Sequence, residues 1–364
     1  MGYFKKIIFN NFRNFSYFSI DFDSACNIIV GKNGSGKTNI LEGLSLFEKG
    51  KGFKKEKISN LINFENKNKN FNISSIFNNK DISLDVNIYN SEKNLKKILV
   101  NNSEEKESIN HFESLFSIIY FLPEMERLFL APPSLRRNFL DRLIFNHNKN
   151  YNKIVNNYKK AINERQVLLK DNLYDEIWIE NLEKNIAEFA YQIYEKRNSQ
   201  IDIINKILQE MNLLTHFSHK FLLQIKDDFL DNNLEAIYDK EIFVSHLKNN
   251  RKIDFLSGGC SIGPHRSDFL GFNLENNFNL SQLSTGQQKT VILLIIIAQC
   301  KYLIDQLKFS PIILLDEVCS HLDSKNRELL LYLVDELNIQ VFMTGTENNF
   351  FSFLSTKANY CNIA

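Results

Sequence analysis

The loop that decides the fold of this chain reads Gly31-Lys32-Asn33-Gly34-Ser35-Gly36-Lys37-Thr38. It matches the G-x-x-x-x-G-K-[ST] pattern of phosphate-binding P-loops. The apolar run 26–30 before it predicts a buried strand, and residues 38–44 after it can begin a helix. Such a loop directs free backbone N–H groups and the positive end of the helix dipole toward one point. The sequence therefore predicts an α/β domain that binds a nucleotide.

Each part of this loop has a chemical role. Its glycines let the backbone approach a phosphate without a Cβ in the way. Lys37 can reach the β- and γ-phosphates, so we also count it as catalytic, and the Thr38 hydroxyl can ligate Mg²⁺. The predicted nucleotide-binding residues are the loop and the residue after it, namely Gly31, Lys32, Asn33, Gly34, Ser35, Gly36, Lys37, Thr38 and Asn39.

The composition is that of an ordinary globular protein with more than one lobe. The chain has 364 residues and a formal net charge of +1, so a nucleic-acid site would have to be a local basic patch. Its five cysteines include no C-x-x-C pair, which favours a reducing, intracellular setting and argues against a zinc site. The longest apolar run, 291–298, is far shorter than the ~20 residues of a membrane span. We also find no secretory pattern at the N-terminus and expect a cytoplasmic protein with no membrane contact.

Residues 1–124 are predicted to form the N-terminal part of an ATP-binding head. Strand-like runs lie at 3–9, 15–22, 82–89, 97–100 and 118–121. Alternation of apolar and polar residues in the run 82–89, followed by the run 97–100, predicts a small antiparallel sheet beside the P-loop sheet. The basic loop 49–57 is either a solvated loop or a contact to phosphate or the DNA backbone.

Residues 125–249 are predicted to form a helical insert. After a double proline, Ser134 is a suitable N-cap for a first helix. Two longer helices are predicted over 151–170 and 175–211, because apolar residues recur there every three or four positions. Trp178 belongs to this apolar face, so we expect it in the core rather than on a base-stacking surface.

Residues 250–364 are predicted to form the C-terminal part of the head. The turn Gly263-Pro264-His265-Arg266-Ser267-Asp268, with short strands expected on both sides, is either structural or a catalytic or lobe-contact loop. Later, the apolar strand 311–315 ends in Asp316 and Glu317. Asp316 can hold Mg²⁺, directly or through water. Glu317 can orient or deprotonate an attacking water as the catalytic base.

A second phosphate-binding pattern precedes the most apolar helix of the chain. Leu283-Ser284-Thr285-Gly286-Gln287 reads L-S-x-G-Q, the signature of ABC-type ATPases, and Ser320-His321-Leu322-Asp323 follows as a D-loop. One P-loop does not need a second phosphate-binding surface for the same nucleotide. We therefore expect a head-to-tail homodimer, in which each signature caps the γ-phosphate of the ATP bound by its partner.

The spacing of these motifs predicts the architecture. Leu283 lies 252 positions after Gly31, a gap far longer than in transporter ATPases, so a large segment is inserted between the halves of the head. The predicted fold is an α/β ABC-type P-loop ATPase head, built from a mixed sheet with helices plus a small antiparallel sheet, with an inserted helical lobe.

Four further segments are distinctive: Asn11-Phe12-Arg13-Asn14, Leu135-Arg136-Arg137-Asn138-Phe139-Leu140-Asp141, the turn 263–268, and Thr344-Gly345-Thr346. Together with the P-loop, the signature and Asp316-Glu317, they resemble the RecF family of bacterial recombination mediators over nearly the whole chain. Transporter ATPases carry a switch histidine near the position of Thr344 and Thr346. We assign these two threonines as sensor residues, similar to the RecF pattern.

The resemblance implies an ATP-dependent protein of DNA repair and replication. Such a protein would dimerise with ATP on gapped DNA or single-strand/double-strand junctions, and would hydrolyse ATP slowly with stimulation by DNA. With RecR and RecO it would help load RecA. Backbone contacts would make DNA binding sequence-independent and salt-dependent. The candidate DNA contacts are Lys54, Lys55, Arg136, Arg137 and Arg142.

Two other classes of function remain open. A transport- or translation-type ABC ATPase is opposed by the long gap between P-loop and signature and by the missing switch histidine. An ATP-gated scaffold with no DNA role and negligible turnover is opposed by Glu317, because a scaffold needs no catalytic base. An ATPase assay with and without DNA separates these classes.

Overall fold

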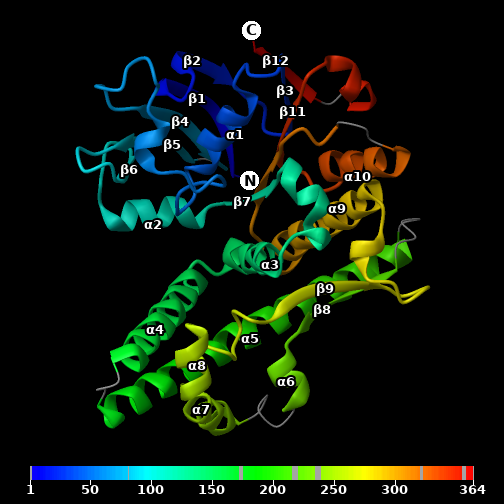
Figure 1. Cartoon of the computed structure of the whole chain (residues 1–364). Helices are drawn as coiled ribbons and strands as arrows, with labels where there is room; N and C mark the ends of the chain where they lie inside the picture. Colours follow the sequence, from blue (N-terminus) through cyan, green and yellow to red (C-terminus); the bar gives the residue numbers. More distant parts are fainter. Residues whose placement is uncertain are drawn as a thin grey trace. The chain divides into compact units, whose positions relative to one another are not determined.

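The computed structural model of the chain describes residues 2–80, 82–171, 175–214, 220–233, 239–319, 323–354 and 358–363. The chain forms two compact units, shown in Figure 1: Met1–Glu126 with Thr285–Ala364, and Arg127–Ser284. The second unit covers residues 127–249 of the predicted helical lobe and also includes residues 250–284, which were expected in the head.

Two five-stranded sheets build the first unit. The parallel sheet has the order β12-β3-β11-β10-β7 and consists of β3 (Cys26–Gly31), β7 (Ser117–Phe121), β10 (Pro311–Leu315), β11 (Gln340–Gly345) and β12 (Ala358–Ile363). The antiparallel sheet has the order β2-β1-β4-β5-β6 and consists of β1 (Gly2–Phe12), β2 (Phe15–Asp21), β4 (Asn72–Asn79), β5 (Ile82–Asn90) and β6 (Lys96–Val100). The predicted combination of a P-loop sheet and an antiparallel sheet is confirmed.

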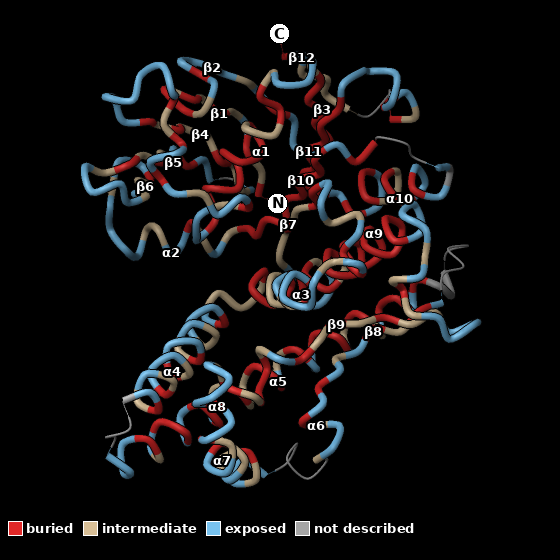
Figure 2. The backbone as a smooth tube through the Cα atoms, viewed as in Figure 1, coloured by how far each residue is buried: buried red, intermediate tan, exposed pale blue. Residues whose placement is uncertain are grey.

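Helix α1 (Lys37–Ser45), which follows the P-loop, lies between these two sheets (Figure 1). Its side chains Ile40, Leu41 and Leu44 are fully buried in one core with residues of β1 and β10. All residues of β10 and β11 are buried as well, as the red tube in Figure 2 shows. Parallel strands that are covered on both faces read as continuous apolar runs, which is why the sequence marks them so clearly.

The remaining helices of the first unit are α2 (Lys106–Ser114), α9 (Thr285–Lys301) and α10 (Ser324–Asp335), with 3-10 turns at Ile58–Leu61 and Asn348–Leu354 and another, Pro123–Leu130, that runs into the second unit. Helix α9 continues as a π-helical segment, Tyr302–Gln306. The combined helix Thr285–Gln306 is long and apolar enough to cross a membrane, but 83% of its most apolar stretch is buried inside the protein. Such burial is typical of the core helix of a globular head.

The second unit is mostly helical. Its elements are α3 (Pro133–His147), α4 (Tyr151–Asp171), α5 (Glu176–Leu214), β8 (Phe221–Lys226), α6 (Asp228–Asn232), α7 (Lys240–Asn249), α8 (Arg251–Ser257), β9 (Asp268–Asn273) and a 3-10 turn at Leu280–Gln282. Strands β8 and β9 pair antiparallel. The two long predicted helices are confirmed as α4 and α5, which pack against each other. Inside the unit, Arg165 donates to the buried carboxylates of Glu183 and Asp254 at 2.9 and 2.6 Å.

Three local predictions were wrong. Helix α3 begins at Pro133 with Pro132 as N-cap, so Ser134 lies in the first turn. Proline suits that first position because the N–H it lacks would have no helical partner there. Trp178 is 53% exposed, because its neighbour Ile179 is fully buried and takes the inward position on α5. The segment before the turn 263–268 contains helix α8 rather than a strand.

Candidate functional site

The P-loop connects β3 to α1, as the sequence predicts. Gly34 and Gly36 have φ of 86° and 102°, in the left-handed region that glycine adopts without strain. Gly36 also stands at the N-terminus of α1, where the first backbone N–H groups have no helical acceptor. The loop therefore has the local geometry of an anion-binding site.

Lys37 lies along the inside of this loop. Its side chain is 4% exposed, and Nζ donates to the backbone oxygens of Gly31 and Lys32 at 2.8 and 3.0 Å. These bonds hold the ammonium group beside the backbone N–H groups at the start of α1, so both can face the same phosphate.

The oxygen donors that would hold Mg²⁺ are already together. Thr38 Oγ1 donates to Asp316, with distances of 2.9 and 3.1 Å to its two carboxylate oxygens. Asp316 directly follows β10 and is 4% exposed. Hydroxyl and carboxylate oxygens are the ligands that Mg²⁺ prefers, so this pair fits the ion that the sequence predicts.

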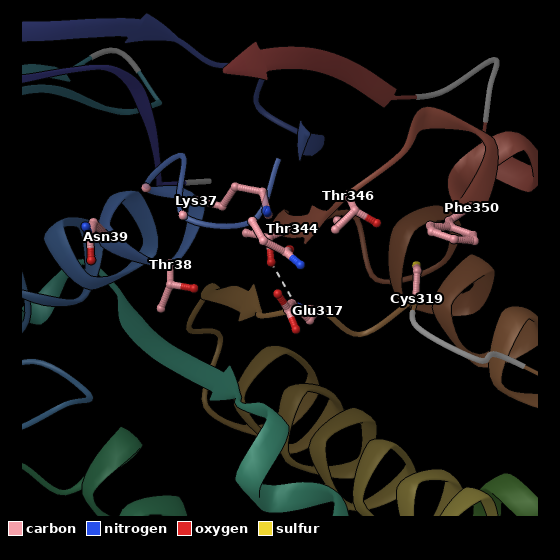
Figure 3. A pocket seen from close by; sticks show the side chains of 12 residues that line it. Lys37, Thr38, Asn39, Glu317, Cys319, Thr344, Thr346 and Phe350 are labelled. Carbon is pink, nitrogen blue, oxygen red and sulfur yellow. Dashed lines mark hydrogen bonds between the residues drawn. The ribbon is translucent and has the colours of Figure 1, made fainter. Parts of the chain in front are cut away.

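Thr344, the last residue but one of β11, connects the two acidic residues. Its hydroxyl donates to Asp316 Oδ1 at 2.6 Å and accepts from the backbone N of Glu317 at 2.8 Å. Glu317 has φ of 50°, an uncommon conformation for a non-glycine residue that surrounding contacts must maintain. Figure 3 shows the bond between Thr344 and Glu317 near Lys37. Thr344 is thus placed to set the position of the predicted base.

Most of these residues line one pocket of about 370 Å³ (Figure 3), whereas Asp316 and the predicted loop residues Gly31, Lys32 and Ser35 are not part of its lining. Its lining comprises Asn33, Gly34, Gly36, Lys37, Thr38, Asn39, Glu317, Cys319, Thr344, Gly345, Thr346 and Phe350. The fold thus brings together the P-loop, the predicted base and both predicted sensors. Sequence reasoning missed Cys319 and Phe350. Cys319 could have been suspected from its place two residues after Glu317, whereas Phe350 reaches the pocket only through the turn after β11.

Burial keeps the thiol of Cys319 protonated. The side chain of Cys319 is 4% exposed, and this burial raises the pKa of the thiol to about 12. Cys319 is therefore neutral at physiological pH and acts as part of the apolar wall of the pocket.

The other ABC motifs lie outside the pocket lining. Thr285, Gly286 and Gln287 form the first turn of α9, and Ser284 is the last residue of the second unit. Asp323 caps α10 by accepting a hydrogen bond from the backbone N of Asn326 at 2.8 Å. The remaining D-loop residues, 320–322, lie outside the described ranges. The roles of the signature and the D-loop in a dimer stay predictions.

The candidate DNA contacts fall in both units. Lys54 and Lys55 are exposed, although Lys54 Nζ also lies 3.7 Å from Glu42. Arg137 and Arg142 are half-buried. Arg136 is 9% exposed and forms a two-pronged ion pair with Asp268, at 2.8 and 2.6 Å. Because its guanidinium is engaged internally, we withdraw Arg136 from the DNA candidates.

The ion pair between Arg136 and Asp268 connects two of the distinctive sequence segments, 135–141 and 263–268. Arg137 donates to the backbone oxygen of Ser267 at 2.6 Å. Arg197 on α5, which is 4% exposed, donates to Asp141 and to the backbone oxygen of Pro264. The segments 135–141 and 263–268 therefore interlock inside the second unit. Of the alternatives for the turn, a structural role fits these contacts.

His265, which belongs to the turn 263–268, also makes contacts inside the second unit. Its Nδ1 accepts from the Tyr158 hydroxyl at 2.8 Å, and its Nε2 lies 3.0 Å from the backbone oxygen of Cys260. Burial lowers the pKa of His265. A neutral ring with one acceptor and one donor nitrogen satisfies both contacts, as a structural residue does.

Comparison with known proteins identifies the family of this chain. The model of one family, described as the RecF/RecN/SMC N-terminal domain, matches residues 3–360. The chain belongs to this family. The resemblance that its motifs predict is thereby confirmed, and so is the ABC-type ATPase head.

Among its relatives is the DNA replication and repair protein RecF of Rickettsia peacockii (strain Rustic). It is 29% identical over 348 residues, which cover 96% of this chain and 95% of the relative. The DNA replication and repair protein RecF of Rickettsia canadensis (strain McKiel) is 29% identical over 356 residues, covering 97% of each chain.

Solved structures agree with these relatives. The structure described as the recombination mediator protein RecF-ATPrS in the RecFOR pathway has a TM-score of 0.82 and 25% identity, and covers 96% of this chain and 94% of its own. The corresponding RecF-ATP structure has a TM-score of 0.79 and 25% identity, with coverage of 100% and 98%. The Smc head domain from Pyrococcus furiosus, at 19% identity and a TM-score of 0.53, shares the fold. The chain is accordingly an ATPase of the ABC type with ATP as its ligand.

Proposed function

We propose that this protein is an ATP-dependent, DNA-binding recombination mediator of the RecF type. The observation that carries the proposal is the single pocket that joins the P-loop, Glu317 and Thr344. A scaffold with no turnover would not need a carboxylate at that place. Relatives named as DNA replication and repair proteins, matched over nearly their whole length, support the DNA role.

The P-loop, Thr38, Asp316 and Glu317 each have a defined part in the proposed reaction. The N–H groups of the P-loop and Lys37 bind the phosphates, while Thr38 and Asp316 hold Mg²⁺. The bound ion would screen the charge of the phosphates. Glu317 orients an attacking water and accepts its proton, a role whose loss lowers the rate roughly 10²- to 10⁴-fold.

The signature residues connect ATP binding to dimerisation. We propose that Ser284, Thr285, Gly286 and Gln287 bind the γ-phosphate held by a second copy of the chain, so that ATP stabilises a head-to-tail dimer. To move a monomer–dimer equilibrium from 1:99 to 99:1, ATP must favour the dimer by about 5.5 kcal/mol. Two sets of charge-assisted hydrogen bonds, each worth about 1.5–3 kcal/mol per bond, can supply this. Hydrolysis of ATP removes these contacts, and the dimer dissociates.

The proposed DNA site is a local basic surface, since the net charge of +1 gives no general attraction to DNA. Its candidate residues are Lys54 and Lys55 in the first unit, and Arg137 and Arg142 in the second unit are separate candidates for DNA contacts. The proposed substrate is gapped DNA or a single-strand/double-strand junction, bound through its backbone. RecR, RecO and RecA are the proposed partners, and the cytoplasm of a bacterium is the proposed location.

Steady-state ATP hydrolysis, with Mg²⁺ or with EDTA and with or without gapped DNA, tests this proposal. We expect slow, Mg²⁺-dependent hydrolysis that DNA stimulates, and DNA binding that weakens steeply with salt. Hydrolysis that gapped DNA does not change, together with no DNA binding at low salt, would instead favour an ABC-type ATPase scaffold without a DNA role.

A further inference from the structure

The hairpin between β1 and β2 turns at Arg13 and Asn14, because Phe12 pairs with Phe15 across this turn. Arg13 has φ of 52°, which L residues rarely adopt without support from their surroundings. Its backbone N donates to the oxygen of Leu61 at 2.8 Å. The turn is therefore fixed, and both of its side chains reach the element that binds the nucleotide.

Asn14 contacts the P-loop on both sides of Lys37 and Thr38. Its Nδ2 donates to the backbone oxygen of Ser35 at 3.1 Å, and its Oδ1 accepts from Asn39 Nδ2 at 2.8 Å. The approach is close enough that a Cβ on Gly36 would lie 2.6 Å from Asn14 Nδ2. One exposed amide thus spans the segment whose N–H groups face the phosphate.

Arg13 holds the helix that follows. Its Nε and Nη2 donate to the two carboxylate oxygens of Glu42 on α1, at 2.8 and 2.6 Å, and its Nη1 donates to the backbone oxygen of Asn60 at 3.1 Å. Glu42 is 1% exposed. A carboxylate so deeply buried needs a well-aligned cation, and the planar guanidinium fork fixes position as well as charge.

We propose that Arg13 and Asn14 are positioning residues of the nucleotide site. They act through Ser35, Asn39 and Glu42, and they hold the P-loop and α1 in the geometry that binds phosphate before the nucleotide arrives. A loop that is ordered in advance loses less conformational freedom on binding, and affinity rises accordingly. This inference rests on ATP binding by the P-loop, which is part of the proposed function.

The first test uses Asn14→Ala, with Tyr17→Ala as the matched control. Tyr17 lies on the same hairpin and is 66% exposed. ATP affinity is measured by displacement of a fluorescent ATP analogue, and thermal melting is recorded in parallel. We expect Asn14→Ala to weaken ATP binding roughly three- to tenfold, as fits the loss of neutral hydrogen bonds. Its melting temperature should match that of the control, and the KM for ATP should rise more than kcat falls.

The second test separates positioning by Arg13 from simple stabilisation. Arg13→Lys keeps the charge but loses the fork, and Arg13→Met leaves the buried Glu42 without its main partner. We expect ATP affinity to fall in that order. The double variant Arg13→Met/Glu42→Gln removes the buried charge, so its melting temperature should recover. Its ATP affinity should stay low, because the helix is still unanchored.

Two results would overturn the inference. One is an ATP affinity of Asn14→Ala equal to that of Tyr17→Ala. The other is a recovery of affinity together with melting temperature in the double variant, since Arg13 would then serve stability alone. If the wild-type protein itself bound no ATP, the proposed function would fail instead, and the two failures are thus distinguishable.

Discussion

Replacement of Thr344 by valine tests how the catalytic carboxylates are held. Valine has nearly the same shape as threonine, so the fully buried position stays filled while the hydroxyl is lost. Asp316 then loses a donor at 2.6 Å, and the backbone N of Glu317 loses its acceptor at 2.8 Å. The left-handed backbone of Glu317, with φ of 50°, is free to relax, which moves its carboxylate away from the place of the attacking water.

The expected magnitude follows from these two bonds. A hydrogen bond to a charged group contributes about 1.5–3 kcal/mol, and one between neutral groups about 0.5–1.5 kcal/mol. The combined loss is therefore about 2–4.5 kcal/mol. If the whole loss appears as a higher free energy of the transition state, kcat falls roughly thirty- to two-thousandfold, at 1.36 kcal/mol per factor of ten.

Single-turnover and steady-state ATP hydrolysis measure this effect, with thermal melting as a check on folding. Thr344→Ser is the matched control, since it keeps the hydroxyl and removes only a methyl group. We expect the serine variant to retain most of the activity and the valine variant to bind ATP but hydrolyse it slowly. Equal kcat values for the two variants would refute the role of the Thr344 hydroxyl.

Three further outcomes are expected. Glu317→Gln should bind ATP and accumulate as a dimer, because the base is lost while phosphate contacts persist; gel filtration with ATP that shows only monomer would contradict this. Ser284→Arg should bind ATP normally but remain monomeric in light scattering, and a dimer of this variant would disprove capping by the signature in trans. Burial lowers the pKa of Lys96, whose Nζ donates to Leu46 and Glu48 backbone oxygens, to about 8. Between pH 8 and the ordinary lysine pKa of 10.5, the unfolded state binds more protons than the folded state, so the free energy of unfolding rises with pH. Over this range the free energy of unfolding of the wild type should rise by about 3 kcal/mol relative to that of Lys96→Met. Parallel pH profiles of unfolding for the two proteins would contradict the lowered pKa.

The sequence predicts the nucleotide pocket well because its chemistry requires fixed residue types at fixed spacings. The P-loop, Asp316, Glu317 and Thr344 each follow a strand of the parallel sheet or lie at its end, and the carboxyl ends of parallel strands meet at one edge. Motifs that follow different strands of this sheet are therefore expected to lie close together in the folded protein.

Contacts between distant segments were not predictable in this way. Arg13 and Glu42 are separated by 29 residues, and neither position carries a pattern that names its partner. Arg197 and Pro264 are 67 residues apart, so the sequence could not show that the turn 263–268 is bound internally. Periodicity also failed at Trp178, because its neighbour Ile179 fits the same apolar stripe and is the residue that is buried.

The central claim is that ATP binding in this pocket closes a dimer that holds DNA. Light scattering gives its most direct test, with the mass measured with ATP, with ADP and without nucleotide, each in the presence and absence of gapped DNA. The account predicts a mass that doubles only with ATP, and a dimer that retains gapped DNA. A mass that no nucleotide changes would contradict the ATP-gated dimer, even if the P-loop binds ATP.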